Sequence, residues 1–385
     1  MKKNSTIMAQ LLQLIPRYKF EKAVKTYHGD KHAKGLSCWQ YFVSLLFAQL
    51  TGLDSLRSIT QTLSSVANRL YHLGLRIISR STLAYAHNHR SHHILEETFY
   101  SLLSFVRGRA MKHSFRFKNP LFSIDSTVID LCLSVFNWAK FRKKKGGIKL
   151  HTKLNHSGYL PEIMYVSNAA DNDQKHAGRY SFSKGDIVLF DRGFDNYERY
   201  ASYCKEGIYF VTRMKSDAAY KVVERRNVSK YKYITSDWTI MYTGYYSKQK
   251  CPLKLRRIRS IDPETGKAIE ILTNIFHLSA VTIASLYKER WQIEIFYKTI
   301  KQNLKIKSFI GTSRNAVLAQ LWVAMITYLL LAYLKFLSSI SWAIGQLHTL
   351  VSHILFLKKD LWFWLNKPFE ASHPLVPKTL QMELL

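Results

Sequence analysis

The segment "LFSIDSTVIDL", residues 121–131, opens the part of the sequence that decides the fold. It follows Pro120, and two segments of the same character come next, "GIKLHTKLN" (147–155) and "YLPEIMYVSNAA" (159–170). Glycine-containing turns separate the three segments. Short apolar segments bounded by turn residues are typical of β-strands, so we expect three consecutive strands here.

A fourth strand and a helix follow these three. The segment "DIVLFDRGF" (186–194) has four apolar residues after Asp186, and a helix is expected from Asn196 to Glu206. Five more strand-like segments lie between residues 208 and 275: "IYFVTRM", "YKVVERR", "WTIMYTGYY", "LKLRRIRSI" and "AIEILTNI". Strands that alternate with a crossover helix predict a mixed α/β sheet, here with a β-rich insertion.

The segment "LYKERWQIEIFYKTIKQNLKIKSF" (286–309) has the apolar spacing of one amphipathic helix. Its polar residues Tyr287, Arg290, Glu294 and Lys301 are three, four and seven residues apart. At about 100° of rotation per residue, these four side chains fall within roughly 60° of arc. These residues therefore form one polar stripe, which carries a phenol, a guanidinium, a carboxylate and an ammonium group. This combination predicts that the stripe is a functional face of the helix.

The charge of the chain indicates a polyanionic partner. The 385 residues include 57 lysines and arginines against 26 acidic residues, a net charge of +31. Because such a charge destabilises a folded protein through self-repulsion, nucleic acid is the first partner to consider. Residues 1–115 hold 16 of the basic and 5 of the acidic residues, and "CWQYFVSLLFAQL" and "ILEETFYSLLSFV" have helical spacing. We therefore expect a helical DNA-binding domain there.

The remaining composition favours a cytoplasmic protein. No metal-ligand spacing relates the four cysteines, so we expect reduced thiols, at Cys38, Cys132, Cys204 and Cys251. The N-terminus lacks the pattern of a signal peptide. The apolar segment 316–337 is nearly long enough to cross a bilayer, but Gln320, Thr327 and Lys335 interrupt it. We expect a central buried helix there and no membrane contact, with a membrane span as the alternative.

Three carboxylates occupy positions at which they could take part in catalysis or metal binding. Asp125 lies inside an apolar strand, Asp191 ends another strand, and Glu294 is on the helix stripe. If the sheet and the helix pack together, the three carboxylates converge and repel one another unless cations bind between them. Oxygen ligands favour Mg²⁺ or Mn²⁺, and two such ions can promote displacement at phosphorus.

Each carboxylate also has a simpler interpretation when it is taken alone. Asp125 could be a strand or turn carboxylate, and Asp191 could form a turn hydrogen bond. Glu294 could pair with Lys298 at the surface of the helix. Their combination with the stripe favours the functional interpretation.

The sequence resembles a known family at these residues. Tyr287, Arg290, Glu294 and Lys301 match the Y-x2-R-x3-E-x6-K signature of DDE-type insertion-sequence transposases, in the group named after insertion sequence four. Asp125 in "SIDSTV" and Asp191 in "LFDRGF" resemble the two catalytic aspartates of that group, with separations of 66 residues (125 to 191) and 103 residues (191 to 294). The resemblance extends from "LIPRYKF" near the N-terminus to "QLWVAMITYLLL" near residue 331.

The resemblance implies a ribonuclease-H-like mixed sheet with a β-rich insertion, preceded by a helical N-terminal DNA-binding domain. Five segments are then expected: the DNA-binding domain (1–115), the first part of the catalytic domain (116–207), the insertion (208–278), the second part of the catalytic domain (279–340) and a C-terminal helical region (341–385).

The resemblance also implies roles for the residues. Asp125, Asp191 and Glu294 would be catalytic and would bind two Mg²⁺ or Mn²⁺ ions, while Tyr287, Arg290 and Lys301 would engage DNA. Trp238 is the one tryptophan of the insertion and a candidate for stacking on a base, although a core position is the alternative. Lys143, Lys144 and Lys145, beside a glycine turn, are candidates for phosphate contacts or form an ordinary solvated loop.

The function expected from these residues is DNA transposition. The protein would bind the terminal inverted repeats of its own element and act on them and on target DNA by hydrolysis and strand transfer. It would be a homodimer in the synaptic complex and associate with the bacterial nucleoid when bound. The alternatives are a metal-dependent nuclease without strand transfer and a non-enzymatic DNA-binding protein derived from a transposase.

Overall fold

A computed structural model describes residues 5–142, 145–304, 306 and 309–370 of the chain. The chain divides into two compact units, one formed by Met1–Leu102 with Asn315–Leu385 and the other by Leu103–Arg314. We call the first the helical unit and the second the sheet unit.

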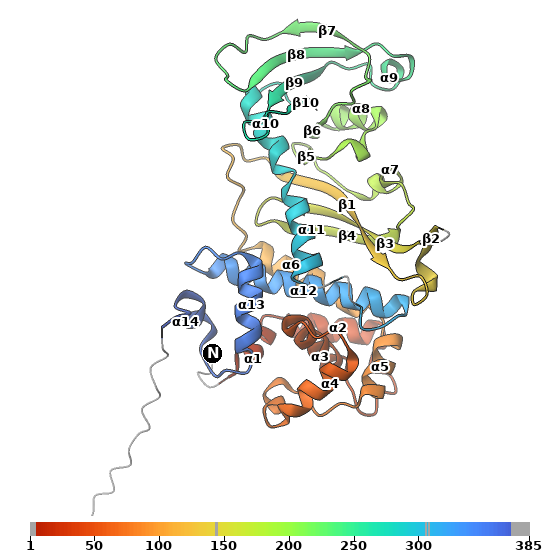
Figure 1. Cartoon of the computed structure of the whole chain (residues 1–385), viewed down its shortest axis with the longest axis vertical. Coiled ribbons are helices and arrows are strands. Elements are labelled where there is room, and N and C mark those ends of the chain that lie inside the picture. Colours follow the sequence, from red (N-terminus) through yellow and green to blue (C-terminus); the bar gives the residue numbers. More distant parts are fainter. Residues whose placement is uncertain (1–4, 143–144, 305, 307–308, 371–385) are drawn as a thin grey trace, which may run out of the picture. The chain divides into compact units, whose positions relative to one another are not determined.

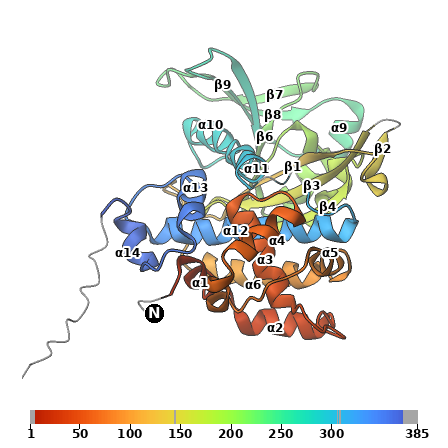
Figure 2. The same cartoon turned by 60° about the horizontal axis from the view of Figure 1, so that its bottom comes forward.

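The described residues of the helical unit form helices joined by short loops (Figure 2). Its elements are α1 (Ile7–Leu12), α2 (Arg17–Thr26), α3 (Cys38–Thr51), α4 (Leu56–Ser65), η1 (Ala67–Leu73), α5 (Arg80–His89), most of α6 (His93–Arg107), nearly all of α12 (Arg314–Leu337), α13 (Ile344–Ile354) and α14 (Leu361–Asn366). Both helical segments expected in residues 1–115 are present, as α3 and α6. Ser37 caps the start of α3, and Gly52 ends it with a φ of 69°, a left-handed conformation that glycine adopts without strain.

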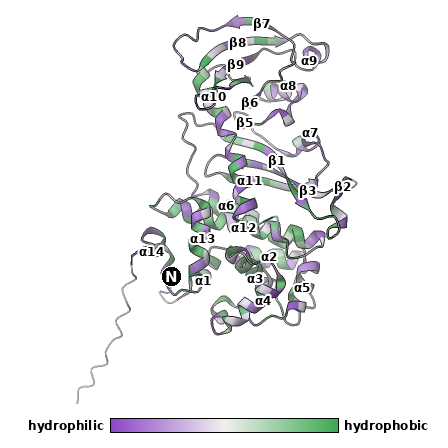
Figure 3. Ribbon diagram, in the orientation of Figure 1, coloured by the Kyte–Doolittle hydropathy of each residue, from purple (hydrophilic) through white to green (hydrophobic). Residues whose placement is uncertain are grey.

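The apolar helix α12 is buried. Its length and composition would allow it to cross a membrane, yet 94% of its most apolar 18-residue segment is buried inside the protein. Its hydrophobic residues appear green in Figure 3, and Trp322 packs on Phe99 of α6 with ring centroids 5.2 Å apart. From Asn315 onward it belongs to the helical unit.

The sheet unit is a mixed α/β structure (Figure 1). Its strands are β1 (Leu121–Leu131), β2 (Lys140–Arg142), β3 (Lys145–Asn155), β4 (Leu160–Asn168), β5 (Ile187–Leu189), β6 (Tyr209–Arg213), β7 (Tyr220–Arg225), β8 (Ile234–Tyr242), β9 (Leu255–Ile261) and β10 (Ala268–Thr273). Its helices are η2 (Asn137–Ala139), α7 (Asp173–His176), η3 (Ala177–Arg179), η4 (Arg192–Phe194), α8 (Tyr197–Glu206), α9 (Tyr245–Lys250), α10 (Ala280–Glu289) and α11 (Gln292–Gln302). Every strand-like segment singled out in the sequence contributes a strand.

All ten described strands join one sheet, in the order β2-β3-β1-β5-β6-β10-β9-β8-β7, with β4 also paired to β3. The pairs β1–β5 and β5–β6 are parallel and the other pairs are antiparallel. The strands of the expected insertion therefore continue the central sheet through β6 and β10 and do not form a sheet of their own.

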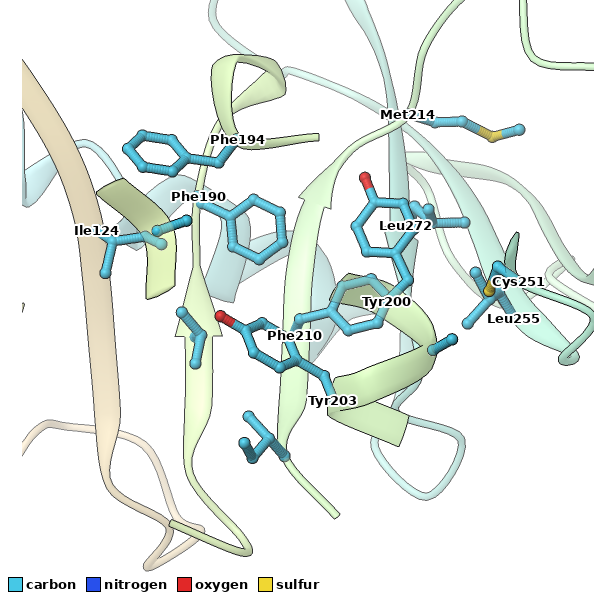
Figure 4. Close-up of a cluster of buried hydrophobic side chains, with 14 of the residues drawn as sticks. Ile124, Phe190, Phe194, Tyr200, Tyr203, Phe210, Met214, Cys251, Leu255 and Leu272 are labelled. Atoms are coloured by element: carbon cyan, nitrogen blue, oxygen red, sulfur yellow. The ribbon is translucent and has the colours of Figure 1, made fainter. Parts of the chain in front are cut away.

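The two faces of this sheet bury different sets of side chains. Val188 of β5 packs with residues of α8 such as Tyr200, whereas its neighbour Leu189 packs with Ile283 and Leu286 of α10. Successive side chains of a strand point to opposite faces, so α8 and α10 cover opposite sides of the sheet. Figure 4 shows the first cluster, in which the ring of Phe190, just after β5, meets aromatic rings from β6 and α8.

Two local expectations are wrong. The segment "WTIMYTGYY" is not a strand to its end, because β8 stops at Tyr242 and Gly244 begins α9, where the Lys248 N–H donates to the Gly244 carbonyl (2.8 Å). The segment 286–309 is not one helix. The N–H groups of Arg290 and Trp291 donate to carbonyls three residues earlier, at 3.2 and 3.1 Å, and this tighter turn separates α10 from α11.

Candidate active site

Asp125 lies in β1, at the centre of the sheet. The strand is paired to β3 along its length, with Asp125 opposite Thr152, and to β5 at Leu121–Ser123 just before Asp125. The Asp125 Oδ1 atom accepts a hydrogen bond from the Ser126 N–H (2.8 Å). Ile124 is buried in the core next to it, so the strand is anchored where the carboxylate is presented.

Asp191 lies two residues beyond the end of β5. It caps the short helix η4, with Oδ1 accepting from the Gly193 N–H (2.8 Å). The rings of Phe190 and Phe194 are 0% and 1% exposed and hold the turn on both sides of Asp191 (Figure 4). Ser123 and Leu189 are register partners in the parallel β1–β5 pair. Asp125 follows Ser123 by two residues and Asp191 follows Leu189 by two residues, in the same direction along the sheet.

Glu294 is in the first turn of α11. Its Oε1 accepts a hydrogen bond from Arg290 Nη2 (2.8 Å), so its ion pair is with the residue four positions before it. The Arg290 side chain is 14% exposed and that of Glu294 34%. The Arg290 Nε–H is buried and has no hydrogen-bond acceptor among the described residues. A buried donor without an acceptor is costly unless a ligand supplies one.

Two side chains join α11 to β1. The Tyr297 hydroxyl donates to the Asp125 carbonyl (2.7 Å), and Lys301 Nζ donates to Thr127 Oγ1 (2.6 Å) and to the Val128 carbonyl (2.9 Å). Tyr297 and Lys301 are three and seven residues after Glu294, on the same face of the helix. The helix therefore lies along β1 with Glu294 near Asp125.

The electrostatics of Asp125 reflect this arrangement. Burial raises the pKa of Asp125 to about 7, and the charges of Asp191 and Glu294 also raise it, against the Ser126 N–H and Arg290, which lower it. The carboxylates of Asp191, after β5, and of Glu294, on α11, thus both influence the ionisation of Asp125 on β1. A group of oxygen ligands whose charges oppose one another is suited to a divalent cation.

The other candidate residues lie in different surroundings. Tyr287 is at the end of α10, with the Arg290 guanidinium 5.8 Å from its ring centre. Trp238, in β8, is partly buried against the core, and the guanidinium groups of Arg225 and Arg257 lie 5.5 and 4.7 Å from its ring. Lys143 and Lys144 are outside the described residues, and Lys145 begins β3.

Sequence reasoning missed two residues beside the three carboxylates. Tyr297 lies on the same helix face as Glu294, and its spacing could have identified it. Asp173, the first residue of α7, accepts a hydrogen bond from Ser126 Oγ (2.6 Å). The segment "AADNDQKHAG" around Asp173 carries only the signal of a helix start, so the sequence did not indicate this contact.

The helical unit has a group of potential metal ligands of its own, formed by His92, His93 and Glu96. His93 Nδ1 lies 2.7 Å from Glu96 Oε2, and His92 Nδ1 lies 3.1 Å from Asn315 Oδ1. These contacts already use both Nδ1 atoms within the protein. The cluster is therefore explained by the pairing of His93 with Glu96 within α6 and of His92 with Asn315 of α12.

Comparison with known proteins places this site in a family. Residues 116–330, more than half of the chain, match the transposase DDE domain, and residues 3–76 match a domain of unknown function. A putative transposase of Sinorhizobium fredii is 34% identical over 241 residues, which cover 62% of this chain and 67% of that protein.

Two further relatives come from other bacteria. A probable transposase for an insertion sequence element of Geobacillus stearothermophilus is 29% identical over 59% of this chain and 60% of its own length. A putative transposase for an insertion sequence element of Synechocystis is 24% identical over a region that covers 72% of this chain and 78% of that protein. The match spans Asp125, Asp191 and Glu294, and the chain belongs to the transposases with a DDE domain.

Proposed function

We propose that this transposase uses Asp125, Asp191 and Glu294 as the ligands of two divalent ions, Mg²⁺ or Mn²⁺, on a ribonuclease-H-like sheet. The observation that carries the proposal is the convergence of three carboxylates on β1, after β5 and on α11. The raised pKa of Asp125 supports it, because burial and then the charges of Asp191 and Glu294 disfavour its ionised form, which a bound cation would stabilise. When bound, such ions stabilise the attacking and leaving oxygens of a displacement at phosphorus.

The chain's own groups would orient the DNA. The buried Arg290 Nε–H has no acceptor in the described part of the chain, which supports a contact to a phosphate oxygen beside Glu294. Tyr287 lies near the end of α10, three residues before Arg290, and Lys301 lies in the last turn of α11. Lys301 Nζ donates to β1, so its contact to DNA would replace or share those bonds.

The reaction would proceed in two displacements. Water attacks the phosphodiester at the end of the element and frees a 3′-hydroxyl, which then attacks a phosphodiester of the target. Terminal inverted repeats would be bound through the basic helical region within residues 1–115, in a homodimer that joins two ends in the bacterial cytoplasm. The net charge of +31 supports a nucleic acid partner.

Trp238 would stack on an unpaired base near the cut. The exposed Arg225 beside its ring supports a nucleic acid contact, whereas its packing against the core and against the buried Arg257, which pairs with Glu270, supports the structural alternative. If Trp238→Ala processes the ends of the element at the wild-type rate, Trp238 is a core residue only.

The test of the proposed function is the product formed from DNA that carries the inverted repeat of the element. Incubation with Mg²⁺ and a circular target should give a joined molecule in which the 3′ end of the element is linked to target DNA. Cleaved ends without any joined product, over a range of Mg²⁺ and Mn²⁺ concentrations, would identify a nuclease instead.

A further inference from the structure

We propose that Asp173 is a fourth carboxylate of this metal site, a positioning residue whose Oδ2 binds the water shell of the ion held by Asp125 and Asp191. This inference rests on the proposed function. It adds a residue from α7, an element that the three-carboxylate pattern does not include.

The first observation is the contact between Asp173 and β1. Asp173 Oδ1 accepts a hydrogen bond from Ser126 Oγ at 2.6 Å, and Ser126 directly follows Asp125. Asn172 caps α7 by accepting from the Gln174 N–H, which fixes the start of the helix and the Asp173 backbone. Asp173 is therefore held against the strand that carries the first metal-ligand candidate.

The second observation is that the other oxygen of Asp173 faces the Asp191 turn. A Cβ atom added to Gly193 would lie 3.0 Å from Asp191 Oδ1 and 3.9 Å from Asp173 Oδ2. The two carboxylates thus border the same small volume next to Gly193. Glycine leaves that volume open, and any larger residue would fill it.

The third observation is a buried histidine directed at the same carboxylate. The His151 side chain is 0% exposed, and its Nδ1 lies 3.7 Å from Asp173 Oδ1 without a hydrogen-bond partner among the described residues. Its other ring nitrogen, Nε2, lies 2.8 Å from Ser167 Oγ. The polar neighbours of Asp173 therefore gather at Oδ1 and leave Oδ2 directed toward the site.

Lys149 provides the competing explanation, since its Nζ lies 3.3 Å from Asp173 Oδ1. If Asp173 served only this ion pair, its carboxylate would have no part in metal binding. The ammonium also donates to the Asp171 carbonyl at 2.5 Å, so the backbone holds it beside the site even without Asp173. An ion pair of this kind neutralises part of the charge at Oδ1 and leaves Oδ2 to act on water around a cation. Mg²⁺ keeps several bound waters when proteins bind it. One of these waters would donate a hydrogen bond to Asp173 Oδ2.

The test is Mn²⁺ binding to the full chain without DNA, measured by electron paramagnetic resonance of the free ion. Asp173→Asn should weaken Mn²⁺ binding by about 10- to 100-fold, the usual effect of removing a residue that supports metal ligands. The matched control is Asp171→Asn, which removes the same charge two residues away, where the carboxylate pairs with His176 (3.1 Å). This control should bind Mn²⁺ like the wild type.

Lys149→Gln separates the two explanations. It should bind Mn²⁺ as tightly as the wild type or more tightly, because Asp173 loses a competing cation. If Lys149→Gln and Asp173→Asn weaken binding equally, Asp173 serves only the ion pair and the proposal is wrong. Should Asp173→Asn fold poorly by circular dichroism, Ser126→Ala provides the second variant, since it keeps every charge and should weaken Mn²⁺ binding severalfold.

Asp125→Asn distinguishes failure of this inference from failure of the proposed function. Loss of Mn²⁺ binding in Asp125→Asn together with unchanged binding in Asp173→Asn overturns the role of Asp173 alone. Unchanged binding in both variants overturns the metal site itself.

Discussion

The ionisation of Asp125 depends on its burial and on the other charged residues of the candidate site. Its backbone was predictable from the sequence, because "LFSIDSTVIDL" forms β1 over the expected residues. Its surroundings were only partly predictable. Glu294 and Asp191 came from motifs, but Ser126 and Asp173 meet through a contact across 47 residues that no local pattern encodes. Residue types and spacing therefore identified the ligand candidates and not the groups that hold them.

The raised pKa of Asp125 predicts a pH-dependent loss of stability in the metal-free protein. Because the pKa of Asp125 is about 7 in the folded chain and 3.8 for an ordinary aspartate, the folded state binds more protons between these pH values. The free energy of unfolding then falls as pH rises from about 4 to 7 and stays lower above it. Asp125→Asn removes this effect and should be more stable than the wild type at pH 8 by about 2–4 kcal/mol.

Urea unfolding with a chelator at pH 5 and at pH 8 measures the difference. The advantage of Asp125→Asn should grow from the lower to the higher pH, and saturating Mg²⁺ should remove it by stabilising the wild type. An advantage that is the same at both pH values would mean that Asp125 ionises like an exposed carboxylate.

At the scale of elements, strands were more predictable than the joints between them. Their apolar composition and turn residues are local signals, and each expected strand segment contributes a strand. The start of α9 at Gly244 and the tight turn at Arg290 depend on backbone bonds and on packing, which composition does not show. The contact between Arg290 and Glu294 still forms across that turn, although Arg290 lies two residues before α11.

One buried ion pair fixes the outer strands to the helix that leads into the site. Arg256 of β9 and Asp237 of β8 are 3% and 5% exposed at their side chains, with Arg256 Nη2 2.7 Å from Asp237 Oδ2. Arg256 Nη1 also donates to the carbonyls of Ile275 (3.1 Å) and Leu278 (2.6 Å), just before α10. Arg256 therefore links two strands to the start of α10.

Breaking this pair should be costly. Arg256→Met leaves the Asp237 carboxylate buried with less compensation and should lower the free energy of unfolding by about 3–5 kcal/mol. Combining it with Asp237→Leu should recover part of the loss. The matched control is Lys288→Met, which breaks the exposed pair with Glu264 (3.3 Å) and should cost less than about 1 kcal/mol. Equal losses for Arg256→Met and Lys288→Met in urea unfolding would contradict the account.

At the scale of the whole molecule, charge is the dominant property. The chain carries an excess of 31 positive charges. Packing of the hydrophobic cores of the helical unit and the sheet unit does not require this excess. Charge was also the feature most directly available from the sequence, since it needs no fold. What it could not show is which basic residues touch DNA, because that depends on surfaces and on the bound nucleic acid.

The charge predicts a steep salt dependence of binding to the inverted repeat. If six to ten phosphates are contacted, affinity should fall by about 10³- to 10⁵-fold between 50 and 200 mM salt. Replacing Lys143, Lys144 and Lys145 by alanine should weaken binding and reduce the slope of log affinity against log salt by about 2–3. Fluorescence anisotropy with labelled DNA measures both. An unchanged slope would show that these lysines are a solvated loop.

The proposed function requires that Asp125, Asp191 and Glu294 form one metal site at which the ends of the element are cut. The most direct test is cleavage of labelled inverted-repeat DNA with Mg²⁺ by the wild type and by Glu294→Gln, with end binding measured in parallel. We expect Glu294→Gln to bind the ends and to lose cleavage by at least about 100-fold, as for a group that acts in the transition state. Equal cleavage by both proteins would contradict the account and make α11 a structural helix.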